Sequence, residues 1–369
     1  YREGGRKTDE SETGEGDDGG TEILHELDPF SIINVVSIHL QCKSLSPKCH
    51  LARIGKDCQN PSMKRARADF RDRHPLRLRR SVLTVPAVNK RALAKVTDLD
   101  CDAVIFDLED SVAPGKKDEA RRNLTEFLDQ ASLGWRERII RINGVDSPYV
   151  TEDMQLILAL SPDAVLLPKV EDPGVIQSTA EWLAEANATE GLRIWAMIET
   201  PRGVLNAAAI ASSGRTAGSR LDAFVVGLND LRKATGIPAE QGRGYLVPYM
   251  MQVVLAARAY GLDVIDSVSN DFRDMDAFDA ECGQGRSMGF DGKMLIHPSQ
   301  IGPANDRFGP QAEAIAEARQ VVAQFADPLH AGLNVINING RMIERLHAEE
   351  AERLLEMVAL IEARKDKRA

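Results

Sequence analysis

The feature that most constrains the fold is a rhythm of eight short β-branched runs, each followed by a longer stretch with helical periodicity. The runs span residues 81–87, 103–109, 138–143, 164–170, 193–199, 223–230, 263–269 and 292–298. Eight such units predict an α/β protein with a (β/α)8 TIM barrel. A doubly wound open sheet is the main alternative, but no GxGxxG follows the first run and no Walker motif is present.

The chain divides into four parts around this barrel, which we expect over residues 81–305. Residues 1–20 are mostly Gly, Asp, Glu, Ser and Thr, and the first methionine is Met63. We therefore expect residues 1–62 to be a disordered or non-native extension. Residues 63–80 form a basic arm. We expect this arm to be either a solvated segment or a segment whose last arginines contact a polyanionic ligand. Residues 306–369 are predicted as a C-terminal helical segment, with a helix over 340–364.

Charge and composition exclude several classes of protein. The chain has 46 Lys+Arg against 56 Asp+Glu, a net charge of −10, which argues against general nucleic-acid binding. No apolar run approaches the ~20 residues of a membrane-spanning helix. The five cysteines include no CxxC pair, so a disulfide scaffold and a structural zinc site are disfavoured, and we expect a cytoplasmic protein.

Polar residues stand at the carboxyl ends of the predicted strands. They are Asp107, Glu109, Asp110, Arg141, Lys169, Glu199, Asp230, Asp266 and His297. In a (β/α)8 barrel these ends meet at one mouth, where active sites of this fold are built. Charged residues in apolar strands cost several kcal/mol unless they are paired or bind a ligand. The pattern therefore predicts an active site.

The residue types indicate a magnesium site. Glu199 and Asp230 lie on adjacent predicted strands, and two carboxylates with open positions for water and substrate suit Mg²⁺. Zinc is disfavoured because His297 is the single histidine at the mouth. Arg141 offers a fixed positive charge for a carboxylate or an oxyanion. Asp107 and Glu109 are two residues apart and would share one face of a strand.

Structural interpretations stay open for several of these residues. Arg141 is either a substrate ligand or a partner of the acidic second strand. Asp107 and Glu109 are either catalytic or counter-charges of that arginine. Lys169 lies beside two acidic residues, which argues against a Schiff base. His297 either serves the site or satisfies a loop carbonyl.

Seven motifs together resemble the family of the citrate lyase beta subunit and the malyl-CoA and citramalyl-CoA lyases. They are RRSVLTVPAVNK (79–90), VIFDLEDSVAPGKKDEAR (104–121), IIRIN (139–143), LLPKVE (166–171), MIETPRGVLNA (197–207), VVGLNDL (225–231) and GFDGKMLIHPSQI (289–301). The resemblance runs from about residue 79 to 362 and implies a Mg²⁺-dependent barrel. Such an enzyme cleaves a 3-hydroxy-3-carboxyacyl-CoA to an acyl-CoA and a 2-oxo acid by retro-Claisen chemistry.

The resemblance also implies residue roles. Glu199 and Asp230 would bind the metal, and Arg141 would bind the substrate and stabilise the enolate. Arg80 and Lys90 would face the phosphates of coenzyme A. These roles are expectations.

Two positions depart from the family pattern. Asn229 stands where many relatives carry glutamate, and Glu344 in GRMIERL stands where relatives carry the aspartate that acts as acid or base in a neighbouring subunit. The extra methylene moves the carboxyl by roughly 1 Å, which can matter about a hundredfold. The family pattern implies a homotrimer or a dimer of trimers.

The sequence leaves several functions open. A malyl-CoA or citramalyl-CoA lyase is the leading prediction. Alternatives are a class II 2-oxo-acid aldolase that does not use CoA, a beta component of a citrate lyase complex, and a barrel that binds without catalysing.

Overall fold

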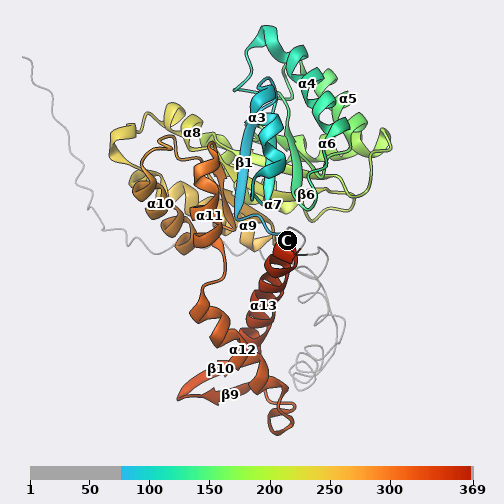
Figure 1. Ribbon diagram of the computed structural model, residues 1–369. Coiled ribbons are helices and arrows are strands. Elements are labelled where there is room, and N and C mark those ends of the chain that lie inside the picture. The colour runs from blue at the N-terminus through green and yellow to red at the C-terminus, as the bar shows by residue number, and fades with distance from the viewer. Residues whose placement is uncertain (1–75, 367–369) are drawn as a thin grey trace, which may run out of the picture. The chain divides into compact units, whose positions relative to one another are not determined.

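The computed structural model describes residues 76–366. The predicted extension over 1–62 and most of the basic arm over 63–80 lie outside the described residues. Eight parallel strands close into a barrel in the chain order β1 to β8, with helices between them (Figure 1). The predicted (β/α)8 barrel is confirmed, and each of the eight predicted strands is present but ends earlier than predicted.

The elements have the following bounds. The barrel strands are β1 Ser81–Pro86, β2 Ala103–Asp107, β3 Glu137–Arg141, β4 Ala164–Leu167, β5 Arg193–Ile198, β6 Leu221–Val226, β7 Asp263–Asp266 and β8 Gly292–Leu295. The barrel helices are α3 Lys90–Lys95, α4 Lys117–Gln130, α5 Val150–Leu160, α6 Pro173–Glu185, α7 Pro201–Ser213, α8 Leu228–Thr235, α9 Val247–Ala259, α10 Met275–Met288 and α11 Ile301–Phe308. The C-terminal segment contains α12 Ala312–Ala326, β9 Val335–Ile338, β10 Arg341–Glu344 and α13 Arg345–Asp366.

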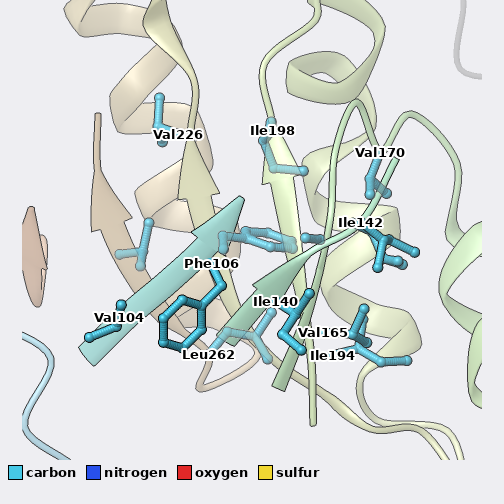
Figure 2. Packing of buried hydrophobic residues seen from close by; sticks show 14 of the residues in the cluster. Val104, Phe106, Ile140, Ile142, Val165, Val170, Ile194, Ile198, Val226 and Leu262 are labelled. Atoms are coloured by element: carbon cyan, nitrogen blue, oxygen red, sulfur yellow. The ribbon is translucent and has the colours of Figure 1, made fainter. Parts of the chain in front are cut away.

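Alternate residues of each strand face the barrel interior or the surrounding helices. Ala103 and Ile105 of β2 belong to the interior cluster, whereas the alternate residues of β2 and β3, among them Phe106 and Ile140, pack in the outer layer seen in Figure 2. Because the period is two, the next interior position of β2 is Asp107. By the same alternation, Arg141 follows the interior residue Ile139 of β3, and Glu199 follows the interior residues Trp195 and Met197 of β5. Both side chains therefore lie at the mouth.

The opposite pole of the barrel is closed by a buried arginine. Arg79 is 3% exposed, and its guanidinium carbon lies 4.7 Å from the centre of the Trp195 ring. It pairs with Glu137 at 2.6 Å, with Asp263 at 2.8 Å and with Asp222. These carboxylates belong to the first residue of β3, the second of β6 and the first of β7, so the cluster connects the beginnings of these strands.

The C-terminal segment has a core of its own. Helices α12 and α13 pack together over an antiparallel hairpin of β9 and β10, and the buried residues include Val321, Ile336 and Ile343. Arg364 near the end of α13 pairs with Asp102 of the barrel at 2.6 Å.

The predicted helix over 340–364 is wrong at its start. Residues 341–344 form strand β10, and the helix begins at Arg345. Asn339 and Gly340 have φ of 53° and 81°, which is the turn that joins two strands in a tight hairpin. The described helices include none long and apolar enough to cross a membrane.

Candidate active site

Asp107 and Arg141 form a two-bond ion pair at the mouth of the barrel. They end β2 and β3 and are direct neighbours in the strand register. Arg141 donates from Nε and Nη2 to the two carboxylate oxygens of Asp107, each over 2.6 Å. Asp107 also accepts the backbone N–H groups of Glu109 and Ser111. Burial opposes its ionisation, but Arg141 and these hydrogen bonds prevail and lower the pKa of Asp107. Asp107 is therefore a fixed anion that orients Arg141.

Glu109 lies beyond the end of β2, between two cations. Its carboxylate is 3.3 Å from Nη1 of Arg141 and 2.7 Å from Nζ of Lys169. Both acidic residues of the second strand thus contact Arg141, although Glu109 does so from a loop and not from a shared strand face. Burial raises the pKa of Glu109 against the opposing effect of Arg141. The carboxyl of Glu109 is suited to exchange a proton.

Glu199 presents a buried oxygen that has no protein partner. Its side chain is 1% exposed, Oε1 accepts the backbone N–H of Lys169 over 2.9 Å, and Oε2 has no hydrogen-bond donor. A Cβ at Gly227 would lie 2.4 Å from Oε2, so glycine is needed there. A buried carboxylate oxygen without a donor requires a cation or a proton.

Asp230 supplies a second negative charge beside Glu199. It lies in the first turn of α8, four residues beyond the end of β6, and not on the strand as the sequence suggested. Burial, and then the charge of Asp230, raise the pKa of Glu199 to about 8, although the N–H of Lys169 opposes the shift. Two carboxylates, one with a free buried oxygen, fit Mg²⁺ with water and substrate completing its shell. Within residues 76–366, no group of three or more His, Cys, Asp or Glu side chains has metal-site geometry.

Arg80 lies at the wrong pole for the predicted contact with CoA phosphates. It precedes the first residue of β1, and its guanidinium bonds Asp102 from Nε over 2.8 Å. A six-residue strand spans ~20 Å, so its beginning cannot reach a ligand at the mouth. Lys90 does lie on the mouth side, at the start of α3, where its exposed ammonium pairs with Glu126 at 2.8 Å. Its role stays a prediction.

Asp266 and His297 are also not brought into the carboxylate site. Asp266 ends β7 and is buried outside the barrel wall, 3.1 Å from Nζ of Lys293, because its neighbour Ile265 takes the interior position. His297 accepts the backbone N–H of Ser299 at Nδ1 and stacks on Phe272, with ring centres 4.6 Å apart.

Glu344 contacts its own C-terminal segment. It ends β10, its side chain is exposed, and its N–H donates to Nδ1 of His347. The structure therefore does not bring Glu344 to the mouth of its own barrel.

A surface cavity is remote from these carboxylates. It measures about 620 Å³ and lies at the N-terminal pole, where it is lined by Arg77, Asp102, Trp135, Arg138 and Arg364, among others. Active sites of this fold lie at the other pole, so the mouth, not this cavity, is the candidate site.

Comparisons with known proteins identify the family of this chain. Residues 80–298 match the family described as HpcH/HpaI aldolase/citrate lyase, and the chain belongs to this family. A (3S)-malyl-CoA thioesterase of Cereibacter sphaeroides is 40% identical over 290 residues, which cover 79% of this chain and 97% of the relative. The mitochondrial citramalyl-CoA lyase of Homo sapiens is 32% identical and covers 77% of this chain and 86% of its own.

A solved structure has a similar fold. The protein CitE from Mycobacterium tuberculosis, crystallised with magnesium, acetoacetate and coenzyme A, is 26% identical. The alignment has a TM-score of 0.60 and covers 76% of this chain and 97% of that chain. The chain is thus a TIM-barrel member of a family that includes CoA-ester lyases and a thioesterase.

Proposed function

We propose that this protein is a Mg²⁺-dependent carbon–carbon lyase that cleaves a malyl-CoA or citramalyl-CoA type thioester. The observation that carries the proposal is the unpartnered Oε2 of Glu199 beside Asp230, facing a mouth that also holds the Asp107–Arg141 pair. Glu199 and Asp230 would hold the metal, which when bound supplies a Lewis acid for the hydroxy acid end of the substrate.

Arg141 is the group suited to the thioester carbonyl. Its orientation is set by two bonds to Asp107, so it needs no reorganisation when negative charge develops nearby. A buried guanidinium acts on such charge more strongly than one in water. Arg141 would therefore stabilise the enolate oxygen.

Cleavage of the C–C bond then needs two proton transfers. A carboxylate base accepts the proton of the substrate hydroxyl, and that oxygen forms the carbonyl of the 2-oxo acid. The adjacent C–C bond breaks, and its electron pair moves into the thioester as an enolate. A carboxylic acid returns a proton to the enolate carbon, which yields the acyl-CoA. Glu109 would make one of these transfers; its contact with Arg141 and its raised pKa support this role.

Glu344 of a second copy is proposed for the other transfer. Val335 and Met342 of the hairpin that carries Glu344 are exposed, and so is Leu346 at the start of α13. These apolar side chains favour packing against another subunit, in a homotrimer or a dimer of trimers.

Hydrolysis of the thioester is the second candidate. It is favoured by the 40% identical relative, which is named a thioesterase. Both reactions use Arg141 at the thioester carbonyl, but hydrolysis breaks the C–S bond and releases free CoA thiol.

One assay separates these reactions. The protein is given malyl-CoA or citramalyl-CoA with Mg²⁺ or with EDTA, and the 2-oxo acid and free thiol are measured together. We expect Mg²⁺-dependent release of the 2-oxo acid without thiol, and its loss in Glu199→Ala and Asp230→Ala. Glu171→Ala is the matched control, because this half-buried carboxylate pairs only loosely, at 3.8 Å, with the exposed Arg202.

The other outcomes overturn the lyase proposal. Thiol release without 2-oxo acid indicates the thioesterase, and turnover of free hydroxy acids indicates a CoA-independent aldolase. Copurifying subunits with activity on a carrier-bound thioester indicate a citrate lyase component. Mg²⁺ binding without turnover of these substrates indicates a binding barrel.

A further inference from the structure

A second buried charge cluster lies outside the barrel wall at β7 and β8. It consists of Asp266, Lys293, Arg243 and Glu281, and we call it the β7–β8 cluster. Asp266 and Lys293 are fully buried. Nζ of Lys293 lies 3.1 Å from Asp266 and 3.2 Å from Glu281, and Arg243 donates to both carboxylate oxygens of Asp266, over 2.9 and 3.2 Å.

The outward direction of this cluster follows from strand parity. Ile265 and Met294 occupy the interior positions, so Asp266 and Lys293 point into the layer beneath α10. Gly285 of α10 leaves room for the carboxylate, since a Cβ there would lie 2.8 Å from Oδ2 of Asp266. The other buried side chains of α10, Phe278 and Cys282, belong to the hydrophobic core. A buried ion pair is weak evidence for stability by itself. The Asp266–Lys293 pair can instead serve to position a neighbouring residue.

The cluster holds Ser267 from two sides. The N–H of Ser267 donates to Oδ1 of Asp266 over 2.8 Å, and its carbonyl oxygen accepts from Nζ of Lys293 over 2.7 Å. The hydroxyl of Ser267 then accepts the backbone N–H of Leu228, the first residue of α8, over 3.0 Å. Ser267 is 1% exposed, so this bond is shielded from water.

Helix α8 needs this bond because it cannot cap itself. The residue before it is Gly227, which must be glycine to leave space for Glu199, and glycine has no side chain to accept a helical N–H. Asp230 lies two residues after Leu228, in the same turn. The contact from Ser267 therefore fixes the helix turn that carries Asp230.

We propose that Ser267, held by Asp266 and Lys293, is a positioning residue that caps α8 from the neighbouring strand and sets the place of Asp230 relative to Glu199. This inference rests on the proposed function of these two carboxylates as Mg²⁺ ligands. Arg243 lies in the loop after α8 and donates to Asp266, so the cluster also fixes the position of this loop.

The test uses Ser267→Ala in the full chain, with Mg²⁺ as the probe. Removing one buried oxygen adds no bulk, so the fold is retained. We expect Mg²⁺ affinity by calorimetry to fall roughly three- to thirtyfold, the size of a lost helix cap. Ser267→Thr keeps the hydroxyl and restores the affinity. In the metal-free protein, backbone amide exchange at Leu228 speeds up in Ser267→Ala.

The matched control is Glu137→Gln in the other buried cluster, around Arg79 at the far pole. We expect it to lower the melting temperature without changing Mg²⁺ affinity. Unchanged affinity in Ser267→Ala, or an equal loss in Glu137→Gln, overturns the inference. If the wild-type protein does not bind Mg²⁺, both the proposed function and the role of Ser267 are overturned. If the wild-type protein binds Mg²⁺ and Ser267→Ala binds it equally well, only the role of Ser267 is overturned.

Discussion

The backbone N–H of Lys169 donates to Oε1 of Glu199 over 2.9 Å, and Lys169 makes this contact from the left-handed conformation, with φ of 50°. A side chain in that region costs about 1–2 kcal/mol relative to glycine. The same residue reaches Glu109 with its ammonium at 2.7 Å. Burial opposes its charge, but the bond to Glu109 prevails and raises the pKa of Lys169. Lys169 thus links two carboxylates of the site at the cost of backbone strain.

This strain predicts an order of stability between two variants. Lys169→Met and Lys169→Gly both remove the ammonium, but glycine accepts the left-handed backbone. We expect Lys169→Gly to be more stable by about 0.5–1 kcal/mol, after allowance for the larger freedom of glycine in the unfolded chain. Urea unfolding measures this difference. Equal midpoints would show that the backbone at 169 relaxes without cost.

Asp107→Asn tests the orientation of Arg141. The change removes the charge that holds the guanidinium in place, so kcat should fall about a hundredfold. Asp110→Asn is the control, because Asp110 is exposed and lies 3.7 Å from Lys169. Steady-state kinetics on the active thioester compares the two. A loss confined to KM would assign Arg141 to ground-state binding alone.

Gly227→Ala tests the space beside Glu199. A Cβ there meets Oε2 at 2.4 Å and Cβ of Glu199 at 2.6 Å, so Glu199 has to move. We expect Mg²⁺ affinity to fall at least tenfold and the protein to lose about 1–3 kcal/mol of stability. Gly144→Ala, also in a loop after a barrel strand, has no atom within 4 Å of the new Cβ and should be neutral. Wild-type affinity in Gly227→Ala would place the metal elsewhere.

Mg²⁺ binding should depend on pH because the pKa of Glu199 is raised to about 8 in the metal-free protein. Burial and the charge of Asp230 favour the protonated form, so at pH 7 Mg²⁺ must displace a proton. Affinity should rise about tenfold per pH unit up to pH 8 and level off above it. Calorimetry in buffers of different ionisation enthalpy should detect close to one proton released at pH 7. Glu199→Gln abolishes this release, and a pH-independent affinity contradicts the prediction.

Local sequence patterns already indicate several of the positions that differ from prediction. The Asn339–Gly340 pair between short β-branched runs is a hairpin signal that predicts β9 and β10, yet helical spacing of Met342 and Ile343 favoured a helix. Arg80 precedes its strand, and a residue in that position belongs to the N-terminal pole. Asp266 directly follows Ile265 in β7, and successive strand residues point to opposite faces. Because Ile265 faces the barrel interior, Asp266 points outward.

The sequence by itself determined the eight-strand rhythm, the pole where the site lies and the interior parity that brings Asp107, Arg141 and Glu199 to the mouth, because strand period is a local property of the chain. Only the tertiary structure decided which groups pair and which remain without a partner. The bond between Leu228 and Ser267 joins residues 39 positions apart, and the pKa of Glu199 depends on burial by several strands. Such contacts arise from barrel closure, which places distant residues side by side and removes water from between them.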